Sequence, residues 1–126
     1  MRPGPDRRSG EGEGPYQTLV IRGGMLIDGT GGPARGPVDI YVRQNRILRI
    51  ANSNVPARGE MRPVQGADKV IDARGMFVLP GLIDLHTHTG GGGKAPDAEY
   101  VYKLWMAHGV TTVRGMLGEP AHLELR

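Results

Sequence analysis

The stretch that decides the fold of this chain lies at residues 80–88 and reads Pro80-Gly81-Leu82-Ile83-Asp84-Leu85-His86-Thr87-His88. If residues 81–88 form a strand, successive side chains alternate between its two faces. Asp84, His86 and His88 then share one face. Two imidazoles spaced two residues apart on one side of a strand can converge on a single metal ion, and zinc binds histidine nitrogens readily. The spacing therefore indicates a metal site.

The same spacing has a plain alternative. A surface strand of an antiparallel sheet also alternates apolar with polar residues, so the carboxylate and the imidazoles could simply face water. Short motifs of this kind match by chance. The choice between the two interpretations therefore depends on the surrounding sequence.

The surrounding sequence favours the metal site. Residues 70–88 read Val70-Ile71-Asp72-Ala73-Arg74-Gly75-Met76-Phe77-Val78-Leu79-Pro80-Gly81-Leu82-Ile83-Asp84-Leu85-His86-Thr87-His88. This run resembles the join between the small β-domain and the (β/α)₈ barrel of the amidohydrolase superfamily, whose members typically read V-I-D-A-x-G-x-x-V-x-P-G-L-I-D-x-H-x-H. Residues 24–31 also match the family. Residues 108–114 look like the second barrel strand of its imidazolonepropionase-like and prolidase-like branches, although Gly115 replaces a frequent Asp there.

The resemblance implies an α/β fold with a small β-sandwich, of which this chain carries the N-terminal part. A (β/α)₈ barrel needs about 250 residues, whereas the chain has 126. We therefore expect a disordered tail at 1–16, a partial composite β-sandwich at 17–80 and the first βαβ unit of a truncated TIM barrel at 81–126. In the family, later strands complete the sandwich. We thus expect an unpaired sheet edge and an uncovered apolar face.

Turn and alternation signals predict short strands within residues 17–80. Gly23-Gly24 predicts a two-residue hairpin turn between Leu19–Arg22 and Met25–Asp28. Gln44-Asn45 predicts a second turn, in which Asn adopts the left-handed conformation. The other strands that we expect here are Val38–Val42, Arg46–Ile50, Lys69–Ala73 and Met76–Leu79.

A strand, a helix and a second strand follow Pro80. Val101, Leu104 and Trp105 have helical spacing and predict one buried stripe of a helix within Asp97–His108. The β-branched residues of 110–114 predict the second strand. This order predicts a βαβ unit with parallel strands. It places the two histidines at the C-terminal end of the first strand, where the active sites of barrel enzymes lie.

The bulk composition excludes several classes of function. The net charge of +3 is spread among interleaved acids, and one Phe and one Trp provide no stacking platform for nucleic acid. No apolar run is long enough to cross a membrane. The absence of cysteine excludes disulfides and thiolate ligands, and it fits a reducing cytoplasm while leaving the periplasm open.

Met1–Pro15 lacks the apolar region of a secretory signal, and it is either an unstructured leader or the product of a mistaken start site. We expect a cytoplasmic protein without nucleic-acid or membrane partners.

The family pattern assigns roles to individual residues. It implies that His86 and His88 bind one or two divalent metal ions, expected to be zinc. The family's other ligands (a carboxylated Lys or a Glu, and two more His) and its proton-shuttling Asp come from later strands, so we expect no catalytic residue in this fragment. Asp84 is expected to orient an imidazole, with a purely structural hydrogen bond as the alternative. Lys94 and Arg114 are candidates for substrate contacts.

Two other features have non-catalytic interpretations. His108 stands at the end of the expected helix, where packing or a favourable interaction with the helix dipole is expected. Gly90-Gly91-Gly92-Gly93-Lys94 lacks the spacing of a phosphate-binding loop. We interpret it as a flexible loop after the first barrel strand.

The resemblance implies a metal-dependent amidohydrolase that cleaves a carbon–nitrogen bond of a small-molecule amide, a dipeptide or a cyclic amide with metal-activated water. Its full-length parent is expected to be a homo-oligomer. Two alternatives remain open, a deaminase or phosphotriesterase of the same superfamily and a truncated product without activity. For the 126-residue chain alone we expect no activity, because most of the barrel is absent.

Overall fold

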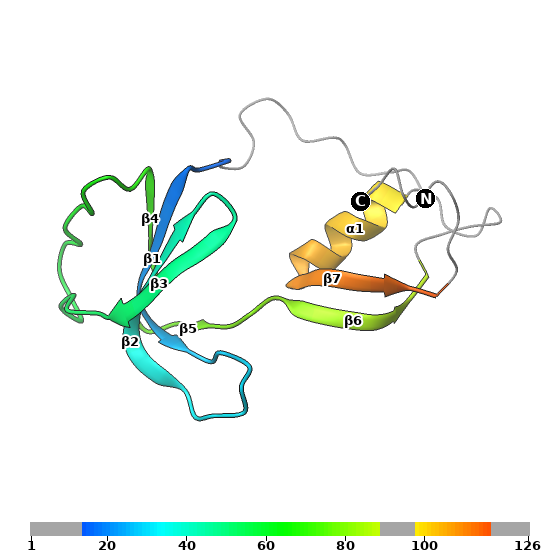
Figure 1. Ribbon diagram of the computed structural model, residues 1–126, viewed down its shortest axis with the longest axis horizontal. Coiled ribbons are helices and arrows are strands. Elements are labelled where there is room, and N and C mark those ends of the chain that lie inside the picture. The colour runs from blue at the N-terminus through cyan, green and yellow to red at the C-terminus, as the bar shows by residue number, and fades with distance from the viewer. Residues whose placement is uncertain (1–13, 89–97, 117–126) are drawn as a thin grey trace. The chain divides into compact units, whose positions relative to one another are not determined.

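The computed structural model describes residues 14–88 and 98–116. The chain divides into two compact units, one ending at Pro80 and the other starting at Gly81 (Figure 1). The tail expected at 1–16 falls largely outside the described residues, as do Lys94 and the glycine-rich loop before it.

The unit that ends at Pro80 is a five-stranded mixed sheet. Its strands follow the order β3-β2-β1-β4, and β5 pairs with β1 as well. β1 is antiparallel to β2 and parallel to β4 and β5, so the first strand of the chain lies at the centre (Figure 1). The strands are β1 (Thr18–Leu26), β2 (Arg35–Arg43), β3 (Arg46–Asn52), β4 (Lys69–Asp72) and β5 (Phe77–Val78).

The hairpin turn predicted at Gly23-Gly24 is wrong, because β1 runs through both glycines without reversing. The long strand β2 pairs with both halves of β1, and the register shifts on either side of Gly24 mark a bulge. Gly23 has a φ of +77°, and its N–H donates to Oδ1 of Asp39 at 3.1 Å. The glycine pair therefore bends a central strand instead of ending it.

Close packing explains why the second of these positions is also a glycine. A Cβ on Gly24 would lie 2.7 Å from Cγ2 of Val78 and 3.2 Å from Cβ of Ala73. Neither neighbour is the end of a long flexible side chain, so the backbone would have to shift. Gly24 thus lets the segment after β4 approach the middle of β1.

We expect Gly24→Ala to destabilise the sheet by about 1–3 kcal/mol, because it overpacks a buried contact. Urea unfolding measures the effect. Gly32→Ala is the matched control, since its nearest neighbour would be Oγ1 of Thr30 at 3.5 Å; it should change stability by less than about 0.5 kcal/mol. Equal stabilities of the two variants would contradict this account of Gly24.

The turn between β2 and β3 forms at residues 44–45 as predicted, but the residue in the left-handed region is Gln44, with a φ of +53°, and not Asn45. The strands predicted after Gly24 are otherwise confirmed, with ends shifted by up to three residues. Within residues 14–80 the structure describes one sheet layer and no second sheet facing it.

One face of the sheet carries the apolar core. Its centre is Leu26, Val38 and Ile40, and partly buried side chains pack around it: Ile21, Val42, Ile50 and Val78. Towards the margins, Ile47 and Phe77 are more than half exposed. The apolar face is thus covered only in part by this unit's own residues.

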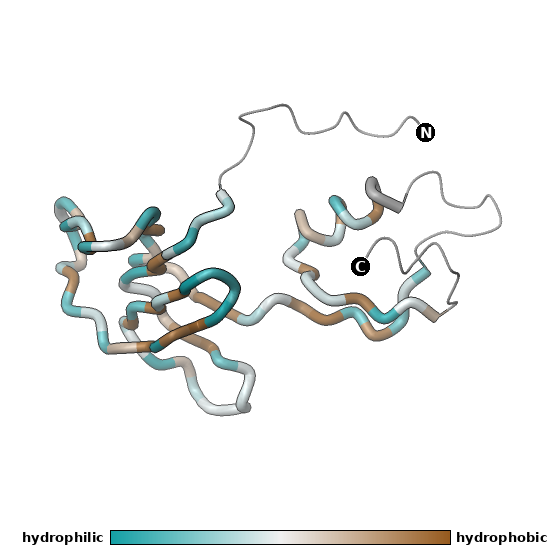
Figure 2. Tube along the Cα trace, turned by 45° about the horizontal axis from the view of Figure 1, so that its top comes forward, coloured by the Kyte–Doolittle hydropathy of each residue, from teal (hydrophilic) through white to brown (hydrophobic). Residues whose placement is uncertain are grey.

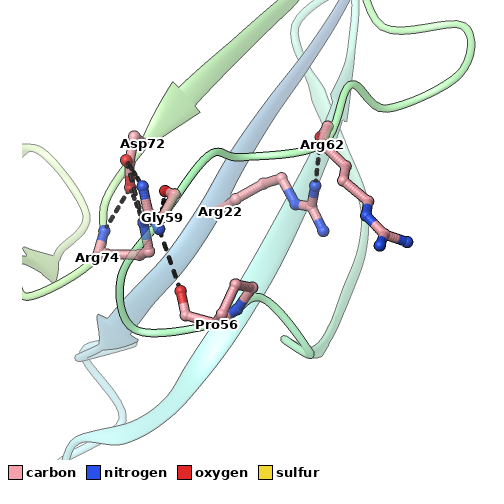
Figure 3. A network of polar contacts seen from close by, with 6 residues as sticks. All are labelled: Arg22, Pro56, Gly59, Arg62, Asp72 and Arg74. Atoms are coloured by element: carbon pink, nitrogen blue, oxygen red, sulfur yellow. Dashed lines mark hydrogen bonds and ion pairs between the residues drawn. The ribbon is translucent and has the colours of Figure 1, made fainter.

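The opposite face carries polar side chains beside the fully buried Val20, and it is held against the segment that joins β3 to β4 (Figure 3). Arg22 lies one residue after Ile21 and so points to this face. Its Nε donates to Oδ2 of Asp39 at 3.1 Å, and its guanidinium donates to the carbonyl of Arg62 at 2.9 Å. Both side chains of the ion pair are almost completely buried.

Arg74 holds the same segment at a second place (Figure 3). Its guanidinium donates to the carbonyls of Pro56 and Gly59 at 3.1 and 2.9 Å. It also forms an ion pair with Asp72, at 2.6 Å between Nη2 and Oδ2. Hydrogen bonds from Arg74 lower the pKa of Asp72 to about 2. The carboxylate therefore stays ionised over the ordinary pH range and keeps the guanidinium in place.

The unit that starts at Gly81 contains β6 (Leu82–Thr87), α1 (Ala98–Ala107) and β7 (Val110–Gly115). β6 and β7 are parallel neighbours, which confirms the predicted strand–helix–strand order and its parallel pairing. The backbone N–H of Leu82 donates to the carbonyl of Gly109 at 2.8 Å. Figure 2 shows that hydrophobic residues alternate with hydrophilic ones along β6. Two of the hydrophobic residues, Ile83 and Leu85, are 62 % and 65 % exposed.

Helix α1 ends as its sequence predicts. Gly109 follows it with a φ of +78°, and Nδ1 of His108 lies 2.8 Å from the carbonyl of Leu104, to which it donates. The side chain of His108 thus satisfies a backbone carbonyl in the last turn of α1. The buried stripe is only partly correct, because Val101 and Trp105 are half-buried whereas Leu104 is exposed. No helix within the described residues is both long and apolar enough to cross a membrane.

Candidate metal site

The two histidines lie at the C-terminal end of β6, with His86 inside the strand and His88 directly after it. Their ring centroids are 5.4 Å apart and the ring planes are inclined by 54°. The imidazoles therefore lie side by side, as the alternation of a strand requires. Both side chains are exposed.

The distance between the rings can be compared with the geometry of zinc. Two imidazoles that bind one tetrahedral zinc ion at about 2.0–2.1 Å have ring centroids roughly 5 Å apart. The separation of 5.4 Å between His86 and His88 is close to this value. The separation of the two rings is therefore compatible with a shared metal ion.

Asp84 contacts the backbone of the histidine segment. Its Oδ1 accepts a hydrogen bond from the backbone N–H of His86 at 3.1 Å, and its side chain is half-buried. Within residues 14–88 and 98–116, no group of three or more His, Cys, Asp or Glu side chains is placed to hold a metal. Asp84 therefore does not complete a ligand set with the two histidines, and it constrains the main chain of one of them.

Arg114 lies near the C-terminal end of β7, the strand parallel to β6. The C-terminal ends of parallel strands lie at the same edge of a sheet, so Arg114 and the histidines share that edge. Its side chain is exposed. Lys94, the other candidate for a substrate contact, lies outside the described residues.

Sequence reasoning missed Thr87, which lies between the two histidines. Thr87 is only 3 % exposed, and its hydroxyl donates to the backbone carbonyl of Arg114 at 3.0 Å. Alternation puts Thr87 on the face of Ile83 and Leu85, but both of these side chains are exposed, so the pattern gives no signal that Thr87 is buried. A buried hydroxyl needs a hydrogen-bond partner, and the carbonyl of Arg114 supplies it.

No family model matches the chain. Comparisons with individual proteins give relatives that are deacylases and dihydroorotases. An N-acyl-D-aspartate deacylase of Alcaligenes xylosoxydans is 45% identical over 73 residues, which are 58% of this chain and 13% of the relative. An N-acyl-D-glutamate deacylase of the same organism is 35% identical over 113 residues, 83% of this chain and 20% of the relative. A dihydroorotase of Bacillus pumilus is 34% identical over 101 residues, which are 79% of this chain and 21% of the relative. The chain thus spans about a fifth or less of the length of these relatives.

Solved structures give the same result. The crystal structure of N-acyl-D-glutamate deacylase from Bordetella bronchiseptica, complexed with zinc and a phosphonate inhibitor, matches with a TM-score of 0.53 and 36% identity over 75% of this chain and 17% of that one. The crystal structure of a Xaa-Pro dipeptidase matches with a TM-score of 0.57 and 28% identity, over 86% of this chain and 29% of that one. These relatives and the two histidines at the end of β6 lead to one conclusion: the chain belongs to the amidohydrolase superfamily.

Proposed function

We propose that this chain provides the first two metal ligands of a hydrolase that cleaves carbon–nitrogen bonds of small-molecule amides. The observation that carries the proposal is the pair of imidazoles, 5.4 Å apart, at the C-terminal end of a strand with a parallel neighbour. In the proposal, β6, α1 and β7 begin a (β/α)₈ barrel and residues 17–80 form part of a β-sandwich. The whole protein is proposed to be a cytoplasmic homo-oligomer.

Each residue of the site has a role in this proposal. His86 and His88 donate ring nitrogens to zinc, in a site for one or two ions. Bound metal supplies an activated water and polarises the amide carbonyl. Asp84 fixes the backbone of His86 through the bond from its N–H, and thereby orients the ring. Arg114 and Lys94 are proposed to contact substrate at the mouth of the site.

The names of the relatives support an amide as the substrate. Two relatives are deacylases of N-acyl-D-amino acids, a third is a dihydroorotase, and a structural neighbour is a dipeptidase. We therefore propose amide hydrolysis in preference to deamination or phosphotriester hydrolysis. The substrate class comprises N-acyl amino acids, dipeptides and cyclic amides.

The test uses the protein translated from the complete gene, assayed on N-acyl-D-amino acids, dipeptides and cyclic amides. We expect hydrolysis to be lost after treatment with a chelator and restored by zinc, because the metal activates the water. The 126-residue chain, assayed in parallel, should be inactive with or without zinc. Hydrolysis that survives complete removal of metal would refute the proposal, as would activity confined to an aminopurine or a phosphotriester.

A further inference from the structure

Thr87 combines burial with a polar side chain in a segment that is otherwise exposed. Among residues 81–88 and 101–116, whose burial the structure describes, it is the one buried residue. Its neighbours His86 and His88 are both exposed. Because burial of a hydroxyl costs free energy unless the group is hydrogen-bonded, the buried hydroxyl of Thr87 requires a hydrogen-bond partner.

Two hydrogen bonds join Thr87 to the end of β7. Its Oγ1 donates to the carbonyl of Arg114 at 3.0 Å, and its own carbonyl accepts from the N–H of Met116 at 3.0 Å. The side chain and the main chain of one residue thus tie the C-terminal ends of β6 and β7 together.

These bonds lie where the pairing of the two strands is irregular. Asp84 pairs with Val113, and Thr87 pairs with Gly115. Between these two pairs the chain advances three residues on β6 but only two on β7, so β6 contains one extra residue. The extra residue forms a bulge, and bulges redirect side chains next to functional sites. His86 lies inside this bulge, and the bond from its N–H to Asp84 holds the other side of it.

We propose that Thr87 is a positioning residue whose hydroxyl closes this bulge and holds the rings of His86 and His88 at a spacing that one metal ion can share. The inference rests on the proposed function for the metal itself. The bulge and its bonds are present without the metal, so the two ideas can be tested separately. Serine retains the hydroxyl, whereas valine has nearly the shape of threonine and leaves the carbonyl of Arg114 without this donor.

The experiment compares Thr87→Val and Thr87→Ser in the 126-residue chain, with Thr112→Val as the matched control because Thr112 is an exposed threonine on β7. Titration with Co²⁺, followed by its absorption spectrum, measures metal affinity. Thr87→Val should raise the Kd by about tenfold or more, as loss of a group that orients a ligand does. Thr87→Ser and Thr112→Val should bind like wild type.

A second measurement needs no metal. In the metal-free chain, nuclear Overhauser effects between the two imidazole rings should be present in wild type and Thr87→Ser, and lost in Thr87→Val. Amide resonances of β6, α1 and β7, the elements of the unit that contains Thr87, report whether each variant remains folded.

The outcomes separate the two hypotheses. If wild type binds cobalt and Thr87→Val binds it equally well with the same ring contacts, only the role of Thr87 is overturned. If Thr87→Ser loses affinity as Thr87→Val does, the hydroxyl is not the reason and the inference also fails. If wild type binds no cobalt, the ring contacts of the metal-free chain decide the inference, which fails if Thr87→Val keeps them; the proposed function is then tested by the assay of the complete protein.

Discussion

Alanine at His86 or at His88 should reduce metal-dependent hydrolysis by the complete protein about a thousandfold or more. Metal activation of water contributes several kcal/mol to lowering the barrier, and each 1.36 kcal/mol corresponds to about tenfold in rate. In the 126-residue chain, whose described residues contain no group of three or more metal-binding side chains, either substitution should abolish the cobalt spectrum. Steady-state kinetics and cobalt titration measure the two effects.

His108→Ala is the matched control for these variants. His108 is also an exposed histidine, but its Nδ1 is engaged with the carbonyl of Leu104 at the end of α1. We expect its metal affinity and rate to equal those of wild type. If His108→Ala lost metal binding while His86→Ala retained it, the ligand assignment would be wrong.

Asp39→Asn should produce the largest loss of stability, about 3–5 kcal/mol, because it leaves a buried guanidinium without its counter-charge. Asp39 is 3 % and Arg22 8 % exposed, and their side chains meet at 3.1 Å. Asparagine preserves the shape and can still accept from the N–H of Gly23. Since a typical domain has only about 5–15 kcal/mol of stability, urea unfolding should show a large shift of the midpoint.

Two further variants test the reason for this loss. Arg22→Met combined with Asp39→Leu removes both charges and should recover much of the stability, because well-packed apolar residues can replace a buried pair. Arg35→Ala removes a partly exposed arginine whose Nε lies 3.7 Å from Asp28, and it should cost less than about 1 kcal/mol. A double variant less stable than Asp39→Asn would show that the isolated charge is not the main source of the loss.

The sequence predicts the strands and the helix well because their signals are local. Alternation in residues 81–88 and the β-branched residues of 110–114 need no information from elsewhere, and β6 and β7 form there in parallel. The hairpin at Gly23-Gly24 fails for a non-local reason. Two glycines fit a tight turn and a packed bulge equally well, and the choice depends on β2 and on Val78, which packs against Gly24.

The candidate site shows the same distinction. The side-by-side placement of His86 and His88 follows from their spacing, and it agrees with the ring distance of 5.4 Å. Their role as ligands remains a prediction, as do those of Asp84, Lys94 and Arg114. Thr87 could not be selected from the sequence, because its importance comes from a register shift against β7. Such shifts depend on how two strands pair, which neither strand encodes alone.

The parallel pairing of β1 with β4 has a consequence for the order of events during translation. The N–H of Thr18 donates to the carboxylate of Asp68, a partner 50 residues later in the chain. β1, β2 and β3 can associate while the nascent chain is still emerging, but one side of β1 stays open until β4 leaves the ribosome. Because contacts between residues far apart in the sequence form slowly, we expect the open side of β1 to stay exposed until the β4 segment has been synthesised, and a chaperone would bind there.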